Sequence, residues 1–408
     1  MTFARRCLAW RTLAVAAVAS VVLGATPGAG SAAVGVTAVP PTVAADCSVD
    51  VTSALNQIVA KARKGATIEL APGGCYRLDG TLHVRDKRGL TIEGNGASLE
   101  ARTVGDRDRR HVWVWGGKDL VIRDLTVRGA NPTPGPEKGY NGARPFQHGF
   151  ALQGVNGARL EGVTVTAVYG DFVYIGPDLR TGRWSTNVAV KDSTLVDGGR
   201  QGIAIVAGKH VVIDRNEIGG AGQSLFDLEP NKATQGAVDV RITRNRTGGA
   251  RHFWLANKAV GTEIRDIVVK GNRMLTPTPG LVFVSGPTSG FRGPMVFADN
   301  DLQTTGTVSD DGSRGAFYLG RVRDVVIRDN RVLLPAGKEM PVVQNHSSLD
   351  IVVTGNEFVN GGQELLVTGP VPSATPTPKS GPSPSTTTPR ATASTVPRAS
   401  TTTSTRPR

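Results

Sequence analysis

The segment Val211-Val212-Ile213-Asp214-Arg215-Asn216-Glu217-Ile218 contains the pattern that decides the fold prediction. Apolar residues alternate with others, two polar residues precede an Asn, and an apolar residue follows two positions later. The pattern returns at intervals of 29, 27, 28, 30 and 26 residues, around Asn245, Asn272, Asn300, Asn330 and Asn356. Alternation of this kind is typical of a strand with one buried face. The regular spacing indicates a repeat protein.

Weaker copies of the pattern occur upstream, at 90–99, 120–127, 160–165 and 188–195, with another residue in place of the Asn. No copy is followed by a long amphipathic stretch, which excludes a βαβ protein. The spacing is too short for a β-propeller blade, and the Leu pattern of a leucine-rich repeat is absent. We therefore predict an all-β protein, a parallel β-helix whose coils stack about 4.8 Å apart. The recurring Asn should form a ladder of hydrogen bonds between coils.

Composition and charge exclude several other classes of protein. The chain has 408 residues, 39% of them hydrophobic, and its 51 Gly show no G-X-Y period, so neither a disordered chain nor a collagen fits. The formal net charge is +13, but eight of these charges lie in two terminal segments that contain no acidic residue. The central part is only mildly basic, and we predict no nucleic-acid partner.

Both ends of the chain are predicted to lie outside the β-helix. Residues 1–33 are typical of a secretory signal peptide, because three Arg precede an apolar run at 13–23 that is short for a membrane span; an uncleaved anchor is the alternative. Residues 34–45 are interpreted as a linker and 46–369 as the β-helix. Residues 370–408, rich in Ser, Thr and Pro, should stay disordered. We expect a secreted or cell-wall-associated protein without a membrane partner.

The start of the β-helix contains two stabilising features. Export would remove Cys7 and leave Cys47 and Cys75, which we expect to form a disulfide in an oxidising compartment; two buried thiols are the alternative. A capping helix is predicted between 50 and 65, because apolar residues at helical spacing share one face: Val51, Leu55, Ile58 and Ala62. This helix should cover the open end of the first coil.

One outer face of the coils is predicted to carry the functional residues. In the strand after each Asn turn, five apolar pairs should point inward: Phe150 with Leu152, Val173 with Ile175, Ile203 with Ile205, Phe226 with Leu228, and Phe253 with Leu255. The residues between them should then face outward in one column: Ala151, Tyr174, Ala204, Asp227 and Trp254. Carboxylates, cations and aromatic rings on one face are typical of a sugar-binding groove.

Asp227 and Glu229 are the main candidates for catalysis. At i and i+2 of a strand they share a face, with Cα atoms about 6.6 Å apart. Two carboxyl groups so placed could act as general acid and as base or nucleophile on a glycosidic bond, with retention and inversion both open. The alternative is a pair of solvent-facing residues paired with Arg or Lys, such as Lys232 or Lys258. Asp171 is predicted as a third catalytic carboxylate, or as a turn residue.

The remaining candidates are predicted to bind substrate. Arg200 and the adjacent Gln201 would hold an acidic sugar, or Arg200 would lower the pKa of a neighbouring carboxyl group. Tyr174 and Trp254 would stack on sugar rings. His148 and His252 are weaker candidates, because surface and turn histidines are common.

Some further segments have two interpretations each. Residues 107–110 form a basic run, interpreted as a solvated surface with acidic-polymer binding as the alternative. Trp113, Trp115 and Trp184 are expected to pack under a long excursion at 129–147. A second excursion lies at 303–316, and long loops on a rigid scaffold often bind ligands. The six His show no metal-ligand spacing, so no metal is predicted, except Ca²⁺ in a lyase.

The span from about 46 to 369 resembles the pectin-lyase-like superfamily of right-handed parallel β-helix proteins with PbH1-type repeats, as found in exported bacterial proteins. The segments Asp50-Val51-Thr52-Ser53-Ala54-Leu55 and Gly65-Ala66-Thr67-Ile68-Glu69-Leu70-Ala71-Pro72-Gly73 are similar to its capped first coil. The run Arg200-Gln201-Gly202-Ile203-Ala204-Ile205, followed by Asp227-Leu228-Glu229-Pro230-Asn231, is similar to a pattern in many exported members. The resemblance implies a right-handed coil and a polysaccharide or cell-wall glycan as partner. The signature motifs of polygalacturonases, pectate lyases and mannuronan epimerases are absent, so none of those activities is implied.

These observations predict a secreted carbohydrate-active protein, first of all a glycoside hydrolase acting through Asp227 and Glu229. One alternative is a lyase on a uronate polymer, which needs Ca²⁺ or an Arg to neutralise the uronate and a base such as Arg200, Lys232 or His252. The other alternative is a non-catalytic protein that binds a surface glycan.

Overall fold

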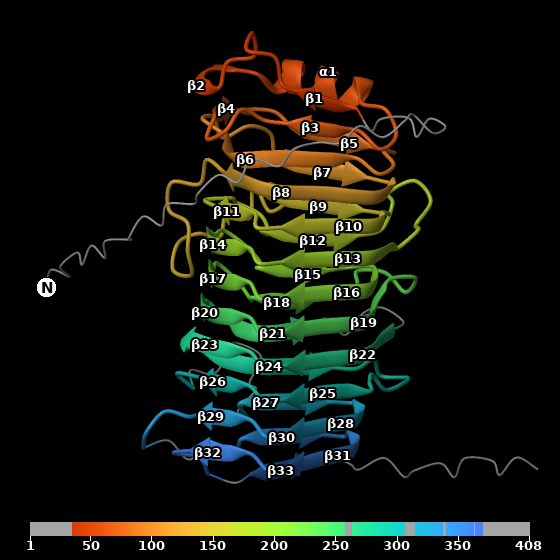
Figure 1. The fold of residues 1–408 in the computed structure, drawn as a ribbon. Coiled ribbons are helices and arrows are strands. Elements are labelled where there is room, and N and C mark those ends of the chain that lie inside the picture. The colour runs from red at the N-terminus through yellow and green to blue at the C-terminus, as the bar shows by residue number, and fades with distance from the viewer. Residues whose placement is uncertain (1–34, 258–262, 307–314, 338–339, 363, 370–408) are drawn as a thin grey trace, which may run out of the picture. The chain divides into compact units, whose positions relative to one another are not determined.

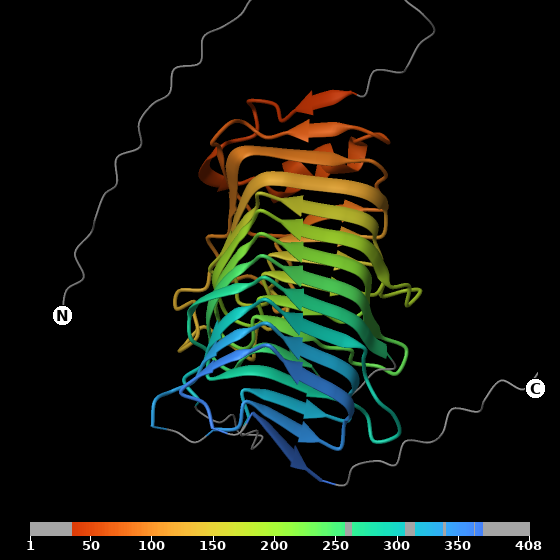
Figure 2. The same cartoon turned by 60° about the horizontal axis from the view of Figure 1, so that its bottom comes forward.

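A computed structural model of the chain describes residues 35–257, 263–306, 315–337, 340–362 and 364–369. The expected signal peptide at 1–33 and the expected tail at 370–408 lie outside these residues. Within them the chain forms a parallel β-helix, in which each strand pairs in parallel with strands one coil away. Figures 1 and 2 show the coils stacked in chain order. The all-β parallel fold predicted from the Asn repeat is confirmed.

Each coil contributes one short strand to an 11-stranded sheet, on which the candidate site lies. Its strands are β5 (Leu82–Arg85), β7 (Val112–Trp115), β9 (Phe150–Gln153), β12 (Val173–Gly176), β15 (Ile203–Ile205), β18 (Phe226–Leu228), β21 (Phe253–Asn257), β24 (Gly280–Ser285), β27 (Phe317–Gly320), β30 (Val343–His346) and β33 (Leu365–Thr368).

The other strands of the described residues form a second, 22-stranded sheet that bends at a corner in each coil. Before the corner lie β1 (Val36–Ala38), β3 (Thr67–Glu69), β10 (Asn156–Glu161), β13 (Ser185–Lys191), β16 (Gly208–Asp214), β19 (Gly236–Thr243), β22 (Glu263–Lys270), β25 (Met295–Ala298), β28 (Arg323–Arg328) and β31 (Leu349–Thr354). After it lie β2 (Asp46–Asp50), β4 (Cys75–Arg77), β11 (Thr164–Thr166), β14 (Thr194–Gly198), β17 (Glu217–Ala221), β20 (Arg246–Ala250), β23 (Arg273–Thr276), β26 (Asp301–Gln303), β29 (Arg331–Leu333) and β32 (Glu357–Val359). The longer strands β6 (Thr91–Glu100) and β8 (Lys118–Arg128) span both parts.

The corner explains why Asn recurs in the sequence. The residue before each ladder Asn has a positive φ, for example 56° at Arg215 and 66° at Gly271, and turns the chain. The Asn then bonds the coils on both sides. Asn272 donates from its backbone N and from Nδ2 to Oδ1 of Asn300, at 3.0 and 2.9 Å, and from Nδ2 to the carbonyl of Ile242 at 2.9 Å. The predicted ladder is therefore confirmed, and it fixes the register of successive coils.

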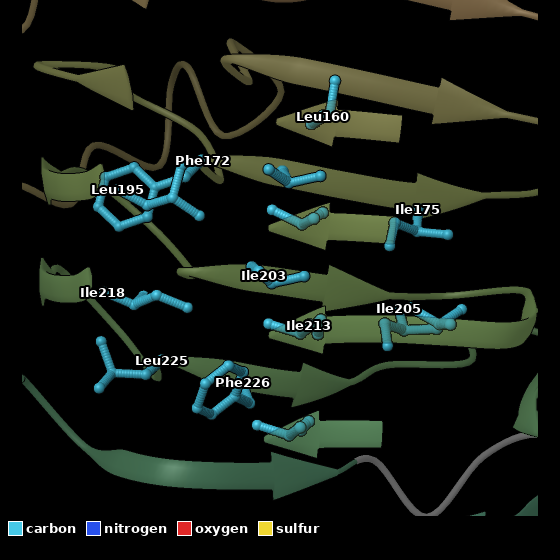
Figure 3. Close-up of a cluster of buried hydrophobic side chains, with 14 of the residues drawn as sticks. Leu160, Phe172, Ile175, Leu195, Ile203, Ile205, Ile213, Ile218, Leu225 and Phe226 are labelled. Carbon is cyan, nitrogen blue, oxygen red and sulfur yellow. The ribbon is translucent and has the colours of Figure 1, made fainter. Parts of the chain in front are cut away.

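The interior of the coils is filled by apolar side chains from both sheets (Figure 3). Ile203 and Ile205 of β15 and Ile213 of β16 are at most 1% exposed, and they pack in one continuous hydrophobic core. Alternate residues of each strand point into this core, which leaves the others for the outer face. The eight apolar residues predicted to point inward from β9, β12, β15 and β18 are all buried.

The N-terminal end of the β-helix differs in one respect from the prediction. Strand β1 lies inside the segment 34–45 expected to be a linker, and it pairs with β3. The β-helix thus begins before Asp46. The prediction missed β1 because a strand as short as Val36–Ala38 gives little periodic signal.

Two features at this end agree with the sequence. The Cys47–Cys75 disulfide is present, with Cα atoms 5.0 Å apart. Helix α1 (Thr52–Lys61), the one helix of the described residues, buries Leu55 and Val59 against the core. It lies at the end of the stack in Figure 1, and its role as a cap remains a prediction. In the described residues no helix is both long and apolar enough to cross a membrane.

Candidate functional site

The outer face of the 11-stranded sheet brings part of the predicted column together. In the parallel register, Tyr174 of β12 lies beside Ala204 of β15, and Ala204 lies beside Asp227 of β18. Ala151 of β9 lies beside Tyr174 on the other side. These four residues therefore face the same way, as the alternation predicts. The two alanines leave room above the sheet for larger side chains from neighbouring strands.

Trp254 does not belong to this column, and the prediction that it faces outward is wrong. Phe226 pairs with Leu255 and not with Phe253, so the assumed alignment of β21 was shifted by two residues. Trp254 is fully buried in the core, where its Nε1 donates a hydrogen bond to Oγ1 of Thr247 at 3.0 Å. It has no surface to offer to a sugar ring.

Arg200 forms the centre of the site by binding two carboxylates at once. Its Nη1 lies 3.0 Å from both carboxylate oxygens of Asp171, and its Nη2 lies 2.8 Å from both oxygens of Glu229. The three residues come from three consecutive coils, next to β12, β15 and β18. Both carboxylates are buried, with Asp171 0% and Glu229 3% exposed. Both Nη atoms of Arg200 are therefore occupied by protein groups.

Gln201 extends this network to Asp227. Its backbone N donates to Oδ1 of Asp171 at 3.1 Å, and its Nε2 donates to Oδ2 of Asp227 at 2.6 Å. Its Oε1 accepts a hydrogen bond from the backbone N of Ser224 at 2.7 Å. All polar atoms of the Gln201 side chain thus hold protein groups, which makes Gln201 a positioning residue.

His148 and Tyr174 form an aromatic pair beside the carboxylates. The backbone N of Asp171 donates to Nδ1 of His148 at 3.0 Å, which places the ring proton on Nε2 of a neutral imidazole. Burial, together with the positive charge of Arg200, lowers the pKa of His148 well below 6.5. The two rings stack with centroids 4.8 Å apart and planes at 16°. Gly176 makes room for Tyr174, because a Cβ there would lie 2.3 Å from its Cε1.

Burial and the charges of the network shift three further pKa values. Burial raises the pKa of Asp171 from 3.8 to about 6, although Arg200 opposes this shift. Burial and the nearby Asp171 and Glu229 raise the pKa of Tyr174 to about 12. Burial alone would lower the pKa of Arg200, but the two carboxylates outweigh it and raise that pKa. The arginine therefore stays charged at any physiological pH.

A cavity of about 500 Å³ opens above this network. Its floor includes His148, Tyr174, Arg200 and Glu229, and the excursion predicted at 129–147 supplies one wall. The full lining is Arg110, Tyr140, Pro145, Phe146, His148, Gln153, Tyr174, Leu179, Arg200, Glu229 and Asn231. A concave, partly aromatic site with a small number of charged and polar groups is a usual form of a small-molecule or sugar site.

The predicted residues divide into three groups in the structure. His148, Tyr174, Arg200 and Glu229 line the cavity; Asp171, Gln201 and Asp227 lie behind its lining and contact those residues. His252, before β21, and Trp254 do not line it. The excursion predicted at 303–316 falls largely on residues 307–314, outside the described part of the chain. Lys258, one of the alternative partners considered for Asp227 and Glu229, also lies outside it.

Sequence reasoning missed Arg110, Gln153 and Leu179 as cavity residues. Arg110 belongs to the basic run at 107–110, which was interpreted as a solvated surface. Gln153 lies at the end of β9, two residues after Ala151 of the predicted column, so the alternation of that strand could have indicated it. Leu179 lies in the loop after β12, where no pattern distinguishes it.

A metal site is not apparent at this network. Within the described residues, the three-residue cluster of possible metal ligands found is Cys47, Cys75 and Glu100. Both cysteines are joined in the disulfide, so their sulfurs cannot act as thiolate ligands. Arg200 places a positive charge between Asp171 and Glu229, at the position a cation would need.

Comparisons with known proteins show the fold. No family model matches the chain, and no curated protein sequence matches it. Among solved structures, a DFA-IIIase from Arthrobacter chlorophenolicus A6 without its lid has a TM-score of 0.60 at 16% identity, over 82% of this chain and 93% of that chain. The Agl-KA catalytic domain has a TM-score of 0.60 at 12% identity, over 85% and 70%. The surface protein and adhesin PfbA of Streptococcus pneumoniae has a TM-score of 0.53 at 14% identity, over 82% and 100%.

These similarities establish a right-handed parallel β-helix of the pectin-lyase-like fold. The same fold occurs in enzymes and in an adhesin, so the fold by itself does not determine function. The argument for function therefore rests on the site.

Proposed function

We propose that this protein is an exported glycoside hydrolase that cleaves a polysaccharide in the cavity above Arg200. The observation that carries the proposal is the position of Glu229, which lines the cavity while Arg200 fixes both of its carboxylate oxygens. A catalytic carboxylate needs both access to substrate and a fixed orientation. The disulfide between Cys47 and Cys75 supports export, because disulfides persist mainly in oxidising compartments.

The two carboxyl groups on the outer face of β18 and its end have separate roles in this proposal. Glu229 reaches the substrate as nucleophile or general base. Asp227, two residues earlier on the same face, lies behind the cavity lining and is bound by Gln201, so we assign it as a positioning residue. Asp171 does not line the cavity, so we assign it as a positioning residue that acts through Arg200. Arg200 itself positions Glu229 and has no Nη atom left to bind an acidic sugar.

The aromatic pair above the carboxylates supports a sugar as substrate. Tyr174 and His148 line the cavity with stacked rings, and a sugar ring packs well against a flat aromatic surface with polar groups at its edge. The neutral imidazole of His148 can donate a hydrogen bond from Nε2 to a hydroxyl group without adding a charge.

The test is incubation of the protein with neutral and acidic polysaccharides, reading new reducing ends and the ultraviolet absorbance of unsaturated products together. Hydrolysis gives reducing ends alone. E229Q should then lose about 10²–10⁴-fold in kcat, the usual share of a general acid or base, and D227N should lose less. E357Q, at the exposed first position of β32, is the matched control and should keep full activity.

A rise in ultraviolet absorbance together with new reducing ends would show that the protein cleaves by elimination and not by hydrolysis. No cleavage in the presence of tight glycan binding would replace the enzyme by a binding protein. Full activity of E229Q would overturn the proposed role of the carboxylates.

A further inference from the structure

Arg110 is a cation of the cavity lining that no carboxylate of the described residues neutralises by an ion pair. Its Nη1 donates a hydrogen bond to the backbone carbonyl of Asp108 at 2.8 Å, and its Nε is buried without a hydrogen-bond partner. Its guanidinium lies over the ring of Trp113, 4.6 Å from the centroid. Arg110 is thus held in place by an aromatic face and a backbone group, both of which leave its charge uncompensated.

Comparison with Arg200 shows how the surroundings of each arginine change its pKa. Two carboxylates hold Arg200, and they raise its pKa. Burial lowers the pKa of Arg110 below its ordinary value, with Asp108 and Tyr174 opposing this only in part. A guanidinium that is partly removed from water and lacks an ionic partner gains most from an anionic ligand. Of the two arginines in the cavity, Arg110 is the one available to a ligand.

Next to Arg110, further arginine and tryptophan side chains contact one another along β7. Trp113 and Trp115 point outward from this strand and stack with centroids 5.1 Å apart and planes at 1°. Arg85 and Arg180 lie over Trp115, at 4.6 and 4.5 Å from its centroid. Their contacts with Asp86, and that of Arg180 with the buried Asp178, are long, at 3.8 Å each, and the exposed pairs with Asp86 are weak.

This surface is continuous with the cavity. Arg110 belongs to both, and Leu179, which lines the cavity, directly precedes Arg180. We call the surface formed by Arg85, Arg110, Trp113, Trp115 and Arg180 the Arg–Trp surface. It offers flat aromatic area together with more positive than negative charge, and sugar rings with anionic substituents match both properties.

We propose that Arg110 binds an anionic group, carboxylate or sulfate, on a sugar of the substrate, and that the ligand of this protein is therefore an acidic glycan that extends from the cavity onto the Arg–Trp surface. The inference rests on the proposed function for the location of the glycan, and it names the class of substrate. It also replaces Arg200 by Arg110 as the residue that recognises the acid.

The experiment measures glycan affinity by titration calorimetry with the whole protein. The probes are polygalacturonate, alginate and dextran sulfate, each compared with a neutral counterpart, which is the carboxyl-reduced polymer or dextran. We expect at least one acidic polymer to bind at least tenfold more tightly than its neutral counterpart. A preference for polyuronates or for dextran sulfate then identifies the anionic group. Poly-L-glutamate, which has carboxylates without sugar rings, should bind at least tenfold more weakly.

The variants assign this preference to Arg110. R110Q should lose at least tenfold in affinity for the acidic polymer, with little change for the neutral one, and R110K should recover most of the loss. R241Q removes an exposed arginine from β19 in the other sheet and should bind like the wild type. Thermal unfolding of R110Q checks that the variant is folded.

Equal affinity for acidic and neutral polymers, unchanged binding by R110Q, or tight binding of poly-L-glutamate would each overturn the inference. Its failure is distinguishable from failure of the proposed function. Cleavage of a neutral glycan by wild type and R110Q alike would leave the hydrolase and remove the acidic substrate. Acidic-glycan binding that depends on Arg110, without cleavage by the wild type, would support the acidic ligand and remove the hydrolase.

Discussion

Nη1 of Arg200 lies 3.0 Å from both carboxylate oxygens of Asp171, which comes from the preceding coil of the β-helix. Because Nη2 of the same arginine holds Glu229, a change of charge on Asp171 acts on the proposed catalytic carboxylate without touching substrate. The pKa of Asp171, raised by burial to about 6, puts this change within the range in which an enzyme is assayed.

The activity of the protein should therefore depend on an ionisation near pH 6 that belongs to Asp171. Below this pH the carboxyl group takes up a proton, and its ion pair with Arg200 weakens. We expect kcat/KM of the wild type to fall as the pH falls through about 6 and D171N to lack this inflection. The pH profiles of the two proteins test this. An inflection that persists in D171N belongs to another group.

The same shift predicts how the stability of D171N varies with pH. Between about pH 4 and 6 the folded protein keeps a proton on Asp171 that the unfolded chain has released, so this group lowers the free energy of unfolding as the pH rises. D171N cannot titrate there. Its free energy of unfolding relative to wild type should rise between about pH 4 and 7, by at most about 3 kcal/mol. A constant or falling difference in urea unfolding would contradict the raised pKa.

Trp254 should matter for stability and not for glycan binding. The side chain is fully buried and packs edge-to-face on Phe226, with ring centroids 5.8 Å apart. W254A should lower the free energy of unfolding by about 3–5 kcal/mol, the usual cost of a large aromatic cavity. W254F should cost less. Denaturant unfolding measures the change in stability, and glycan titration measures the change in affinity. A selective loss of glycan affinity in W254F would support the prediction that Trp254 stacks on a sugar ring.

The Asn ladder should contribute most at its interior positions. In N272A, the backbone N of Asn245 and the carbonyl of Ile242 would lose their partner inside the protein, and Nδ2 of Asn245 would keep only the carbonyl of Ile213. Each unsatisfied buried group costs about 1–3 kcal/mol. N356A, at the less buried end of the ladder, should cost clearly less, because water can replace part of what is lost. Equal losses in thermal unfolding would contradict a cooperative interior ladder.

The disulfide should stabilise the first coils. It closes a loop of 28 residues, for which chain entropy gives about 3–4 kcal/mol. The double variant C47S/C75S should unfold at a lower temperature than the wild type, and a reducing agent should lower the Tm of the wild type but not that of the variant. An unchanged Tm in the variant would show that the N-terminal coils do not limit unfolding.

The sequence predicts the coil well because the ladder Asn has a strict local requirement. A buried amide that must bond two neighbouring coils tolerates few other residues, so its spacing is readable without a structure. The same spacing would have corrected the predicted outward orientation of Trp254. Asn216 precedes Phe226 by ten residues, and Asn245 precedes Leu255 by ten, so counting from the Asn gives the register that the structure shows.

The chemistry of the arginines was less predictable because it depends on contacts between coils. The sequence around Arg200 does not indicate that its guanidinium binds two carboxylates. One of them, Glu229, is 29 residues away. Arg110 lies in a run of charged residues, which usually means a solvated surface. Its place in the cavity follows from the excursion at 129–147, whose path the sequence does not specify.

Arg110 precedes β7 and Glu229 follows β18, and both line one cavity although their coils are four strands apart in the 11-stranded sheet. Neighbouring strands are about 4.8 Å apart, so groups on this face are separated by whole steps of that length. Each coil contacts mainly its neighbours, so one complete coil can be gained in evolution with little disturbance to the rest. A coil gained between β7 and β9 would leave the network of Asp171, Arg200 and Glu229 intact and would move Arg110 away from Glu229 by a single step. It would change which sugar along a chain must carry the acid.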